Sequence, residues 1–245
     1  MRKDREPHFR HEWKYLISDM EMDQIRRRLG LVLSRDAHAL NGEYSIRSLY
    51  FDDYWDSSYS DKVMGYFVRK KYRIRIYNYS DRKISLERKI KVDSYIYKES
   101  APLTREEYDQ IMAGEYGFLE HSPHSLCREF YVECMCHVMR PRIIVDYERE
   151  PFIMEEGTVR ITFDKRVRAA IGLDLFDEGL PVLDVFPPEN VVLEVKYTEF
   201  LPELVRKVLP PAASEFMAIS KYGLCYEKLQ YHWDETYWCE ERKSE

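Results

Sequence analysis

Basic side chains recur at every second position in several short segments of this sequence. Between residues 71 and 76, Lys71, Arg73 and Arg75 alternate with one tyrosine and two isoleucines. Residues two apart in a β-strand share a face, so this segment predicts a strand with one basic and one apolar face. Guanidinium groups bind phosphate oxygens bidentately, and ammonium groups add positive charge. A surface built from such faces would bind a polyanion such as a chain of phosphates.

Five further segments show the same alternation. Their charged faces consist of Arg10, Glu12 and Lys14; Glu87, Lys89 and Lys91; Tyr147 and Arg149; Arg160; and Glu194 and Lys196. In one strand, such a face is typical of the solvated side of an antiparallel sheet. A solvated face usually mixes both signs evenly, but here Lys and Arg outnumber carboxylates by about two to one. The repetition over six strands therefore favours charged faces that point into a closed sheet.

The surrounding pattern predicts an α+β fold, with an antiparallel closed β-barrel of about eight strands and helices packed outside. Two capping-box signatures, Ser18-x-x-Glu21 and Thr104-x-x-Glu107, predict helices to about Leu29 and Ala113. The remaining predicted helices are a short polar helix or loop at 55–64 and helices at 122–138, 202–208 and 216–224. The predicted strands are 9–17, 44–51, 66–79, 83–92, 94–99, 142–153, 158–167 and 191–197, and residues 169–190 are predicted as a surface excursion.

A barrel of this size has an interior that side chains fill or that holds one small ligand. An interior with this many cations requires a polyanion, because confined like charges repel strongly. Glu12, Glu87 and Glu194 add oxygen ligands that would suit a divalent cation such as Mn²⁺ or Mg²⁺ bridging protein and phosphate.

Composition limits the remaining function classes. The net charge of −6 over 245 residues argues against a general nucleic-acid binder. The apolar runs are too short to cross a bilayer, and the first ten residues predict no secretory signal. The five cysteines lack the spacing of a disulfide framework, which indicates reduced thiols. We therefore expect a cytoplasmic protein. We expect one domain over residues 1–226, followed by an acidic tail or final helix over residues 227–245 that either packs or binds a partner.

The ordered motifs resemble one known family. Seven motifs are similar to those of the VTC (vacuolar transporter chaperone) domain. In chain order they are Phe9-Arg-His-Glu-Trp-Lys-Tyr-Leu-Ile, Ser48-Leu-Tyr-Phe-Asp-Asp, Lys71-Tyr-Arg-Ile-Arg-Ile-Tyr, Leu86-Glu-Arg-Lys, Val159-Arg-Ile-Thr-Phe-Asp, Leu193-Glu-Val-Lys-Tyr and Ser220-Lys-Tyr. This domain is the polyphosphate polymerase branch of the triphosphate tunnel metalloenzymes, the CYTH-like superfamily. The resemblance covers roughly residues 8–225, and it implies an antiparallel tunnel barrel with helices outside.

The resemblance also implies roles for individual residues. The cations that would grip the phosphate chain are Lys14, Arg73, Arg75, Lys89, Arg149, Arg160 and Lys196. Ser220 and Lys221 match a phosphate-contacting pair on the helix that closes the tunnel, and Glu194 matches the metal carboxylate. Tyr50 and Tyr147 match wall residues. The assignment of a site role to four further residues depends mainly on the alternation; these are Arg10, Glu12, Glu87 and Lys91.

One departure bears on the activity. The hydrolytic relatives begin with two glutamates and a lysine at alternate positions, whereas this chain has Arg10, Glu12 and Lys14. The replacement resembles the polymerase branch, which transfers the γ-phosphoryl group of ATP to a growing polyphosphate chain. Two alternatives remain: a triphosphatase acting on inorganic or RNA 5′ triphosphate, and a non-catalytic module that binds polyphosphate or nucleotide. The expected partners are therefore a triphosphate such as ATP and inorganic polyphosphate, not DNA; a membrane-protein partner stays open.

Overall fold

The computed structural model describes residues 10–36, 39, 42–92, 95–198, 200–209 and 219–241. Its strands are β1 (His11–Ser18), β2 (Ser34–Arg35), β3 (Tyr44–Asp52), β4 (Val68–Tyr77), β5 (Ser80–Val92), β6 (Tyr95–Leu103), β7 (Arg140–Met154), β8 (Val159–Ala170), β9 (Val182–Asp184) and β10 (Asn190–Tyr197). Its helices are α1 (Asp19–Leu29), α2 (Ser57–Val63), α3 (Arg105–Met112), α4 (Gly117–Glu120), α5 (Ser125–His137), the 3₁₀ turn η2 (Glu156–Thr158), α6 (Glu203–Val208) and α7 (Lys221–Glu241). Within these residues, no helix is long and apolar enough to cross a membrane.

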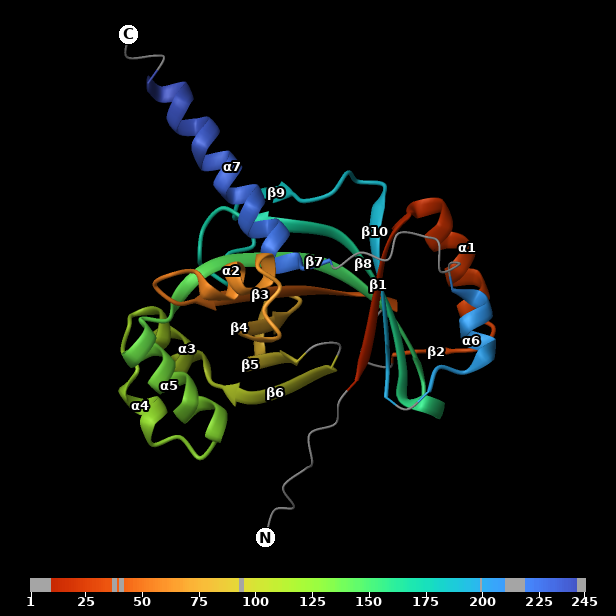
Figure 1. Cartoon of the computed structure of the whole chain (residues 1–245), viewed down its shortest axis with the longest axis horizontal. Coiled ribbons are helices and arrows are strands. Elements are labelled where there is room, and N and C mark those ends of the chain that lie inside the picture. Colours follow the sequence, from red (N-terminus) through yellow and green to blue (C-terminus); the bar gives the residue numbers. More distant parts are fainter. Residues whose placement is uncertain are drawn as a thin grey trace.

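The strands form one strongly curved antiparallel sheet (Figure 1). Its main path is β1-β10-β8-β7-β3-β4-β5-β6, with β2 paired to β7 and β9 paired to β8. The two edge strands, β1 and β6, approach each other, and one isolated bridge joins Arg10 to Ile96. The α+β class and the antiparallel sheet are confirmed, whereas the described pairing does not close into the continuous barrel that the sequence predicts.

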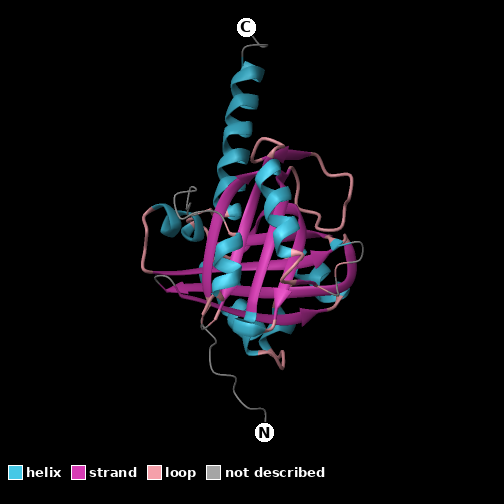
Figure 2. Ribbon diagram, turned by 90° about the vertical axis from the view of Figure 1, so that its right-hand side faces the viewer, coloured by secondary structure: helices cyan, strands magenta, loops and turns pink. Residues whose placement is uncertain are grey.

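Helices cover the convex side of the sheet in two groups, which lie on opposite flanks in Figure 1; in Figure 2 the side with α1 and α6 faces the viewer. The side chains of β4 and β5 that alternate with the basic residues, among them Tyr72, Ile74 and Leu86, pack against Phe130 of α5 and its neighbours in α3 and α4. A second cluster joins β1, β8 and β10 to α1 and α6. As the alternation predicts, the apolar faces turn outward to these helices, and the charged faces of the same strands turn inward.

Local sequence signals account for many element boundaries. Both capping boxes form: Ser18 and Glu21 begin α1, and Thr104 and Glu107 begin α3. The turn between β4 and β5 contains Asn78 and Tyr79, both with positive φ. A turn with two consecutive residues of positive φ matches the right-handed twist of the strands in a tight hairpin. The turn thus places the basic face of β4 beside that of β5.

Three boundaries differ from the sequence prediction. Helix α5 begins at Ser125 rather than at residue 122, with His124 as its N-cap and no side-chain cap. The predicted surface excursion at 169–190 contains strand β9 and the fully buried Leu175, so part of it belongs to the core. Helix α7 runs from Lys221 to Glu241, past the predicted helix end at residue 224. Residues 9, 94 and 216–218, where predicted elements begin, lie outside the described residues.

The concave side of the sheet has two different parts. At one end, apolar residues of the sheet, including Ile143, Val145 and Val192, pack against Tyr222 and Cys225 of α7. From this end α7 extends away from the sheet, as both figures show. The sequence prediction of a uniformly charged interior is therefore correct only for the remaining part of the concave surface.

Candidate functional site

The charged part of the concave surface surrounds a cavity of about 740 Å³. Eleven of the side chains that line it are Lys or Arg, and three are Glu. The cations are Arg10, Lys14, Lys71, Arg73, Arg75, Lys89, Lys98, Arg149, Arg160, Lys196 and Lys221, and the glutamates are Glu12, Glu99 and Glu194. Such an excess of positive charge in a confined space is favourable only when an anion shares it.

Glu12 and Glu194 meet around two lysines. Lys14 Nζ lies 3.7 Å from Glu12 and 3.3 Å from Glu194, and Lys196 Nζ lies 3.6 Å and 2.6 Å from the same two carboxylates. Lys89 adds an ion pair of 2.7 Å to Glu12. Burial alone would raise the pKa of Glu12, but Lys14 and Lys89 overcome it and hold the pKa at about 2. Although burial opposes it, Lys196, Lys221 and Lys14 likewise hold the pKa of Glu194 well below its ordinary value, so both carboxylates remain ionised at neutral pH.

Arg149 and Asp164 form a second, deeper cluster. Arg149 donates two hydrogen bonds to Asp164, at 2.6 and 2.7 Å, and a third to Glu194 at 3.1 Å. Lys221 Nζ lies 2.5 Å from Asp164, and all of these groups are almost completely buried. Although burial opposes it, Arg149 and Lys221 keep the pKa of Asp164 below its ordinary value. This cluster connects the start of α7 to β7, β8 and β10.

The third cluster holds Arg73 and Arg75 on β4. Arg73 binds Glu87 at 2.6 Å, and Arg75 lies 4.0 Å from the same carboxylate. Arg73 also donates to the Tyr50 hydroxyl at 2.8 Å, and Arg75 donates to the Tyr147 hydroxyl at 3.1 Å. Because the two tyrosines and Glu87 fix the guanidinium planes, little conformational entropy remains to be lost when an anion binds.

The predicted residues come from strands far apart in the sequence, and most of them share this cavity. Lys91 is not among the described residues that line it, and Glu87 lies behind Arg73 rather than on its surface. Arg160 lines the cavity and donates to Asp36 and to the Tyr44 hydroxyl. Arg10 lines it from the exposed edge of the sheet.

Several charged members of the site, among them Lys71, Lys98 and Asp164, had not been assigned an individual role. Lys71 shares the inward face with Arg73, as the alternation predicts, but it was not assigned an individual role in the site. Lys98 pairs across the sheet with Lys89, and it was missed because the faces of its strand had not been assigned. Asp164 shares the face of Arg160 by simple alternation, and this signal in the sequence could have identified it.

The three predicted metal carboxylates do not gather into one group. Within the described residues, no cluster of three or more His, Cys, Asp or Glu side chains is placed to hold a metal ion. Glu87 contacts Arg73 and Lys98, whereas Glu12 and Glu194 share their two lysines. Two ionised carboxylates beside an anion site suit Mg²⁺ or Mn²⁺, which commonly takes one or two carboxylates together with substrate phosphates. The Glu12–Glu194 pair therefore fits a divalent cation, and Glu87 does not belong to it.

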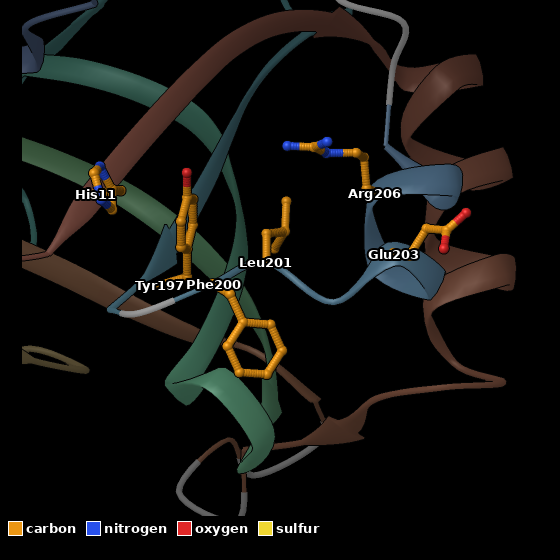
Figure 3. Close-up of a pocket in the computed structure, with 6 residues that line it drawn as sticks. All are labelled: His11, Tyr197, Phe200, Leu201, Glu203 and Arg206. Carbon is orange, nitrogen blue, oxygen red and sulfur yellow. The ribbon is translucent and has the colours of Figure 1, made fainter.

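A smaller pocket of about 310 Å³ lies on the other face of β1 and β10, beside α6 (Figure 3). His11 stacks on Tyr197 with a centroid separation of 4.9 Å, and Arg206 points toward them from α6. The pocket is lined by His11, Tyr197, Phe200, Leu201, Glu203 and Arg206. None of the predicted phosphate-binding or metal-binding residues is among these.

Structural comparison finds similar solved structures at low sequence identity. A putative adenylyl cyclase, HpAC1 from Hippeastrum, described as having a dominant triphosphatase activity, aligns with a TM-score of 0.52 and 14% identity, over 90% of this chain and 95% of that one. The PH1819 protein of Pyrococcus horikoshii OT3 aligns with a TM-score of 0.48 and 15% identity, over 89% and 99%. The Mimivirus capping enzyme triphosphatase aligns with a TM-score of 0.34 and 12% identity, over 83% and 86%.

No curated protein matches the chain in a sequence comparison. The family comparison, in contrast, matches the VTC domain over residues 9–230. This span includes every strand of the sheet, the whole cationic cavity and the start of α7. The chain therefore belongs to the VTC domain family.

Proposed function

We propose that this protein is a metal-dependent polyphosphate polymerase, which transfers the γ-phosphoryl group of ATP to a growing phosphate chain in the cationic cavity. The observation that carries the proposal is the lining of the cavity by eleven Lys and Arg side chains and only three Glu. A linear phosphate chain supplies regularly spaced negative charge. It neutralises all walls of the cavity more completely than a compact anion would.

The residues of the cavity supply positioning and charge stabilisation. Arg73, Arg75 and Arg149, held by carboxylates and tyrosine hydroxyls, would bind the phosphates of the donor and stabilise charge on the transferred group. Glu194 and Glu12 would hold Mn²⁺ or Mg²⁺, which neutralises phosphate charge when bound. The terminal oxygens of a phosphate chain are already ionised, so elongation requires no general base.

Incubation of the purified protein with ATP and either Mn²⁺ or Mg²⁺ tests this function. We expect polyphosphate and ADP in the presence of metal, and no polymer after EDTA treatment. Glu194→Gln should abolish polymer formation, whereas Lys70→Gln should not, because Lys70 lies on the outer face of β4 and pairs with Glu133. Release of ADP and free phosphate without polymer would contradict the polymerase assignment.

A triphosphatase is the second candidate. It is favoured by the shared fold with the Hippeastrum protein, which is described as a dominant triphosphatase. Phosphate release from tripolyphosphate at a rate far above that of polymer synthesis would support this candidate. Tight polyphosphate binding that persists in EDTA, without turnover of either substrate, would identify a binding module instead.

A further inference from the structure

A serine hydroxyl and a lysine amine meet at the wall of the cavity where α7 begins. Lys71 Nζ lies 3.4 Å from Ser220 Oγ, and both residues line the cavity. Lys14 Nζ donates to the carbonyl oxygen of Ile219 at 3.0 Å, and Lys221 reaches Asp164 on the other side. The Ser220 hydroxyl is therefore fixed among the cations that would bind the phosphates of a donor.

The position of Ser220 favours a negatively charged product on its oxygen. Ser220 is the N-cap of α7: its Oγ accepts a hydrogen bond from the Gly223 amide at 3.2 Å, and its carbonyl accepts one from the Leu224 amide at 2.9 Å. The amide groups and the dipole at the start of this helix stabilise an anion there. A phosphate on Ser220 Oγ would lie beside these amides and beside Lys71.

Lys71 is suited to remove the hydroxyl proton. Within the described part of the chain, no carboxylate lies within ion-pair distance of its amine, and its ammonium faces the ring of Tyr222 at 4.6 Å. Burial lowers the pKa of Lys71 to about 7; Lys89, Lys14 and Arg69 act in the same direction, and Asp52 opposes them. A substantial fraction of Lys71 is thus neutral near pH 7, as a general base requires.

We propose that Ser220 is itself a phosphoryl acceptor, phosphorylated within the cavity, and that the resulting phosphoserine is the first unit of a protein-bound phosphate chain. The inference rests on the proposed function for its donor, a nucleoside triphosphate. Ser220 Oγ forms a bond to the γ-phosphorus, and the bond from that phosphorus to its bridging oxygen breaks. The nucleoside diphosphate leaves with the bridging oxygen and its electron pair, and the hydroxyl proton passes to Lys71 Nζ.

This step explains a difference between the first and later transfers. A chain end attacks through an ionised oxygen and needs no base, but the first acceptor in an empty cavity must come from elsewhere. A serine hydroxyl needs a base at hydrogen-bonding distance, and Lys71 provides one. Once protonated, Lys71 becomes the counter-ion of the new phosphate, whose ionised oxygens accept the next phosphoryl group.

Three substitutions separate this chemistry from simple phosphate binding. Ser220→Asn keeps a good N-cap but removes the hydroxyl, and Ser220→Thr keeps both. Lys71→Arg keeps the positive charge but removes the base. The full-length protein is incubated with γ-³²P-labelled ATP and metal, and the label is mapped by peptide mass spectrometry. Tripolyphosphate binding is measured in parallel, and Lys70→Gln is the control.

We expect acid-stable label on Ser220 in the wild-type protein and in Lys70→Gln, label on the threonine in Ser220→Thr, and none in Ser220→Asn. Lys71→Arg should lose at least 90% of the labelling rate and still bind tripolyphosphate. Polymer synthesis without any label on Ser220, or normal labelling of Lys71→Arg, overturns the proposal and leaves the polymerase function intact. Label on Ser220 without polymer supports Ser220 as a phosphoryl acceptor, but it contradicts both the polymerase function and the role of phosphoserine as the first unit of a chain.

Discussion

Two buried charge clusters lie on opposite faces of strands β3 and β7. On the outer face, Asp146 accepts from Arg47 at 2.9 Å and from Arg168 at 2.8 Å, and Tyr79 donates to the same carboxylate at 3.1 Å. On the inner face, Arg75 and Arg149 belong to networks that open on a cavity with a large excess of cations. Both clusters are buried and hydrogen-bonded.

The difference between the clusters lies in access and in charge balance. The outer cluster is covered by the chain around Asp177, whose carbonyl accepts from Arg47, and its two arginines share the Asp146 carboxylate. The inner cluster leaves Lys71 without a carboxylate partner in the described residues, next to an accessible space. Burial of ion pairs is thus poor evidence of a functional site, whereas uncompensated charge at a cavity is good evidence.

The largest expected effect concerns the outer cluster. Asp146→Ala leaves Arg47 and Arg168 without their shared carboxylate, and the loss should lower the free energy of unfolding by about 3–5 kcal/mol. Urea denaturation followed by circular dichroism measures the change. A variant as stable as the wild-type protein would show that the outer cluster is not structural.

Tripolyphosphate should stabilise the protein through the inner cluster alone. At a concentration of 100 times its Kd, binding to the folded state raises the free energy of unfolding by about 2.7 kcal/mol. The increment should be the same in Asp146→Ala, because that cluster lies outside the cavity. Thermal denaturation with and without the anion checks this, and a smaller increment in Asp146→Ala would mean that the two faces are coupled.

Loss of one inner cation should weaken binding with little effect on folding. Arg73→Gln removes a charged hydrogen-bond donor worth about 1.5–3 kcal/mol, which corresponds to a loss of affinity for tripolyphosphate of about 10- to 150-fold. Glu87 keeps Arg75 and Lys98 as partners, so the fold should persist. Isothermal titration calorimetry measures the affinity, with Lys70→Gln on the opposite face of the same strand as the control.

The smallest effect is a pH dependence that only the inner cluster can show. Because the pKa of Lys71 is about 7, the free protein loses this charge as the pH rises from 6 to 8, and a bound phosphate must restore it by proton uptake. The affinity of the wild-type protein should fall by up to about tenfold more than that of Lys71→Arg over this range. The groups that set this titration are Asp52, Lys14, Lys89 and Arg69. Identical pH profiles would exclude Lys71 as the titrating group.

Much of the site could be predicted because alternation is a local property. Once a segment is extended, its sequence alone decides which side chains share a face, and this placed Arg73 with Arg75 and Glu194 with Lys196 correctly. The apolar residues between them then decided which face turns toward the helices. The same alternation put Lys71 on this face, and it would have identified Asp164 had it been extended along the face of Arg160.

Alternation within a strand could not predict which side chains form ion pairs or whether the sheet closes into a barrel. The separation of Glu87 from Glu12 and Glu194 depends on which strands lie beside each other, and β5 meets β1 only through the curvature of the whole sheet. The 3.4 Å contact between Lys71 and Ser220 joins residues 149 positions apart. Sequence spacing carries no information about such a contact.

The sequence by itself determined the strands, their basic faces and the two capped helices, because each depends on interactions within a few residues. Only the tertiary structure decided that α7 fills one end of the concave surface, that the edges β1 and β6 meet at one bridge, and which carboxylates neutralise which cations. These outcomes depend on contacts between residues far apart in the sequence. Burial of apolar area favours the packing of α7 against the sheet, whereas repulsion among the cations of the wall favours space for an anion. The packing of α7 against the apolar end leaves the charged part of the concave surface for phosphate.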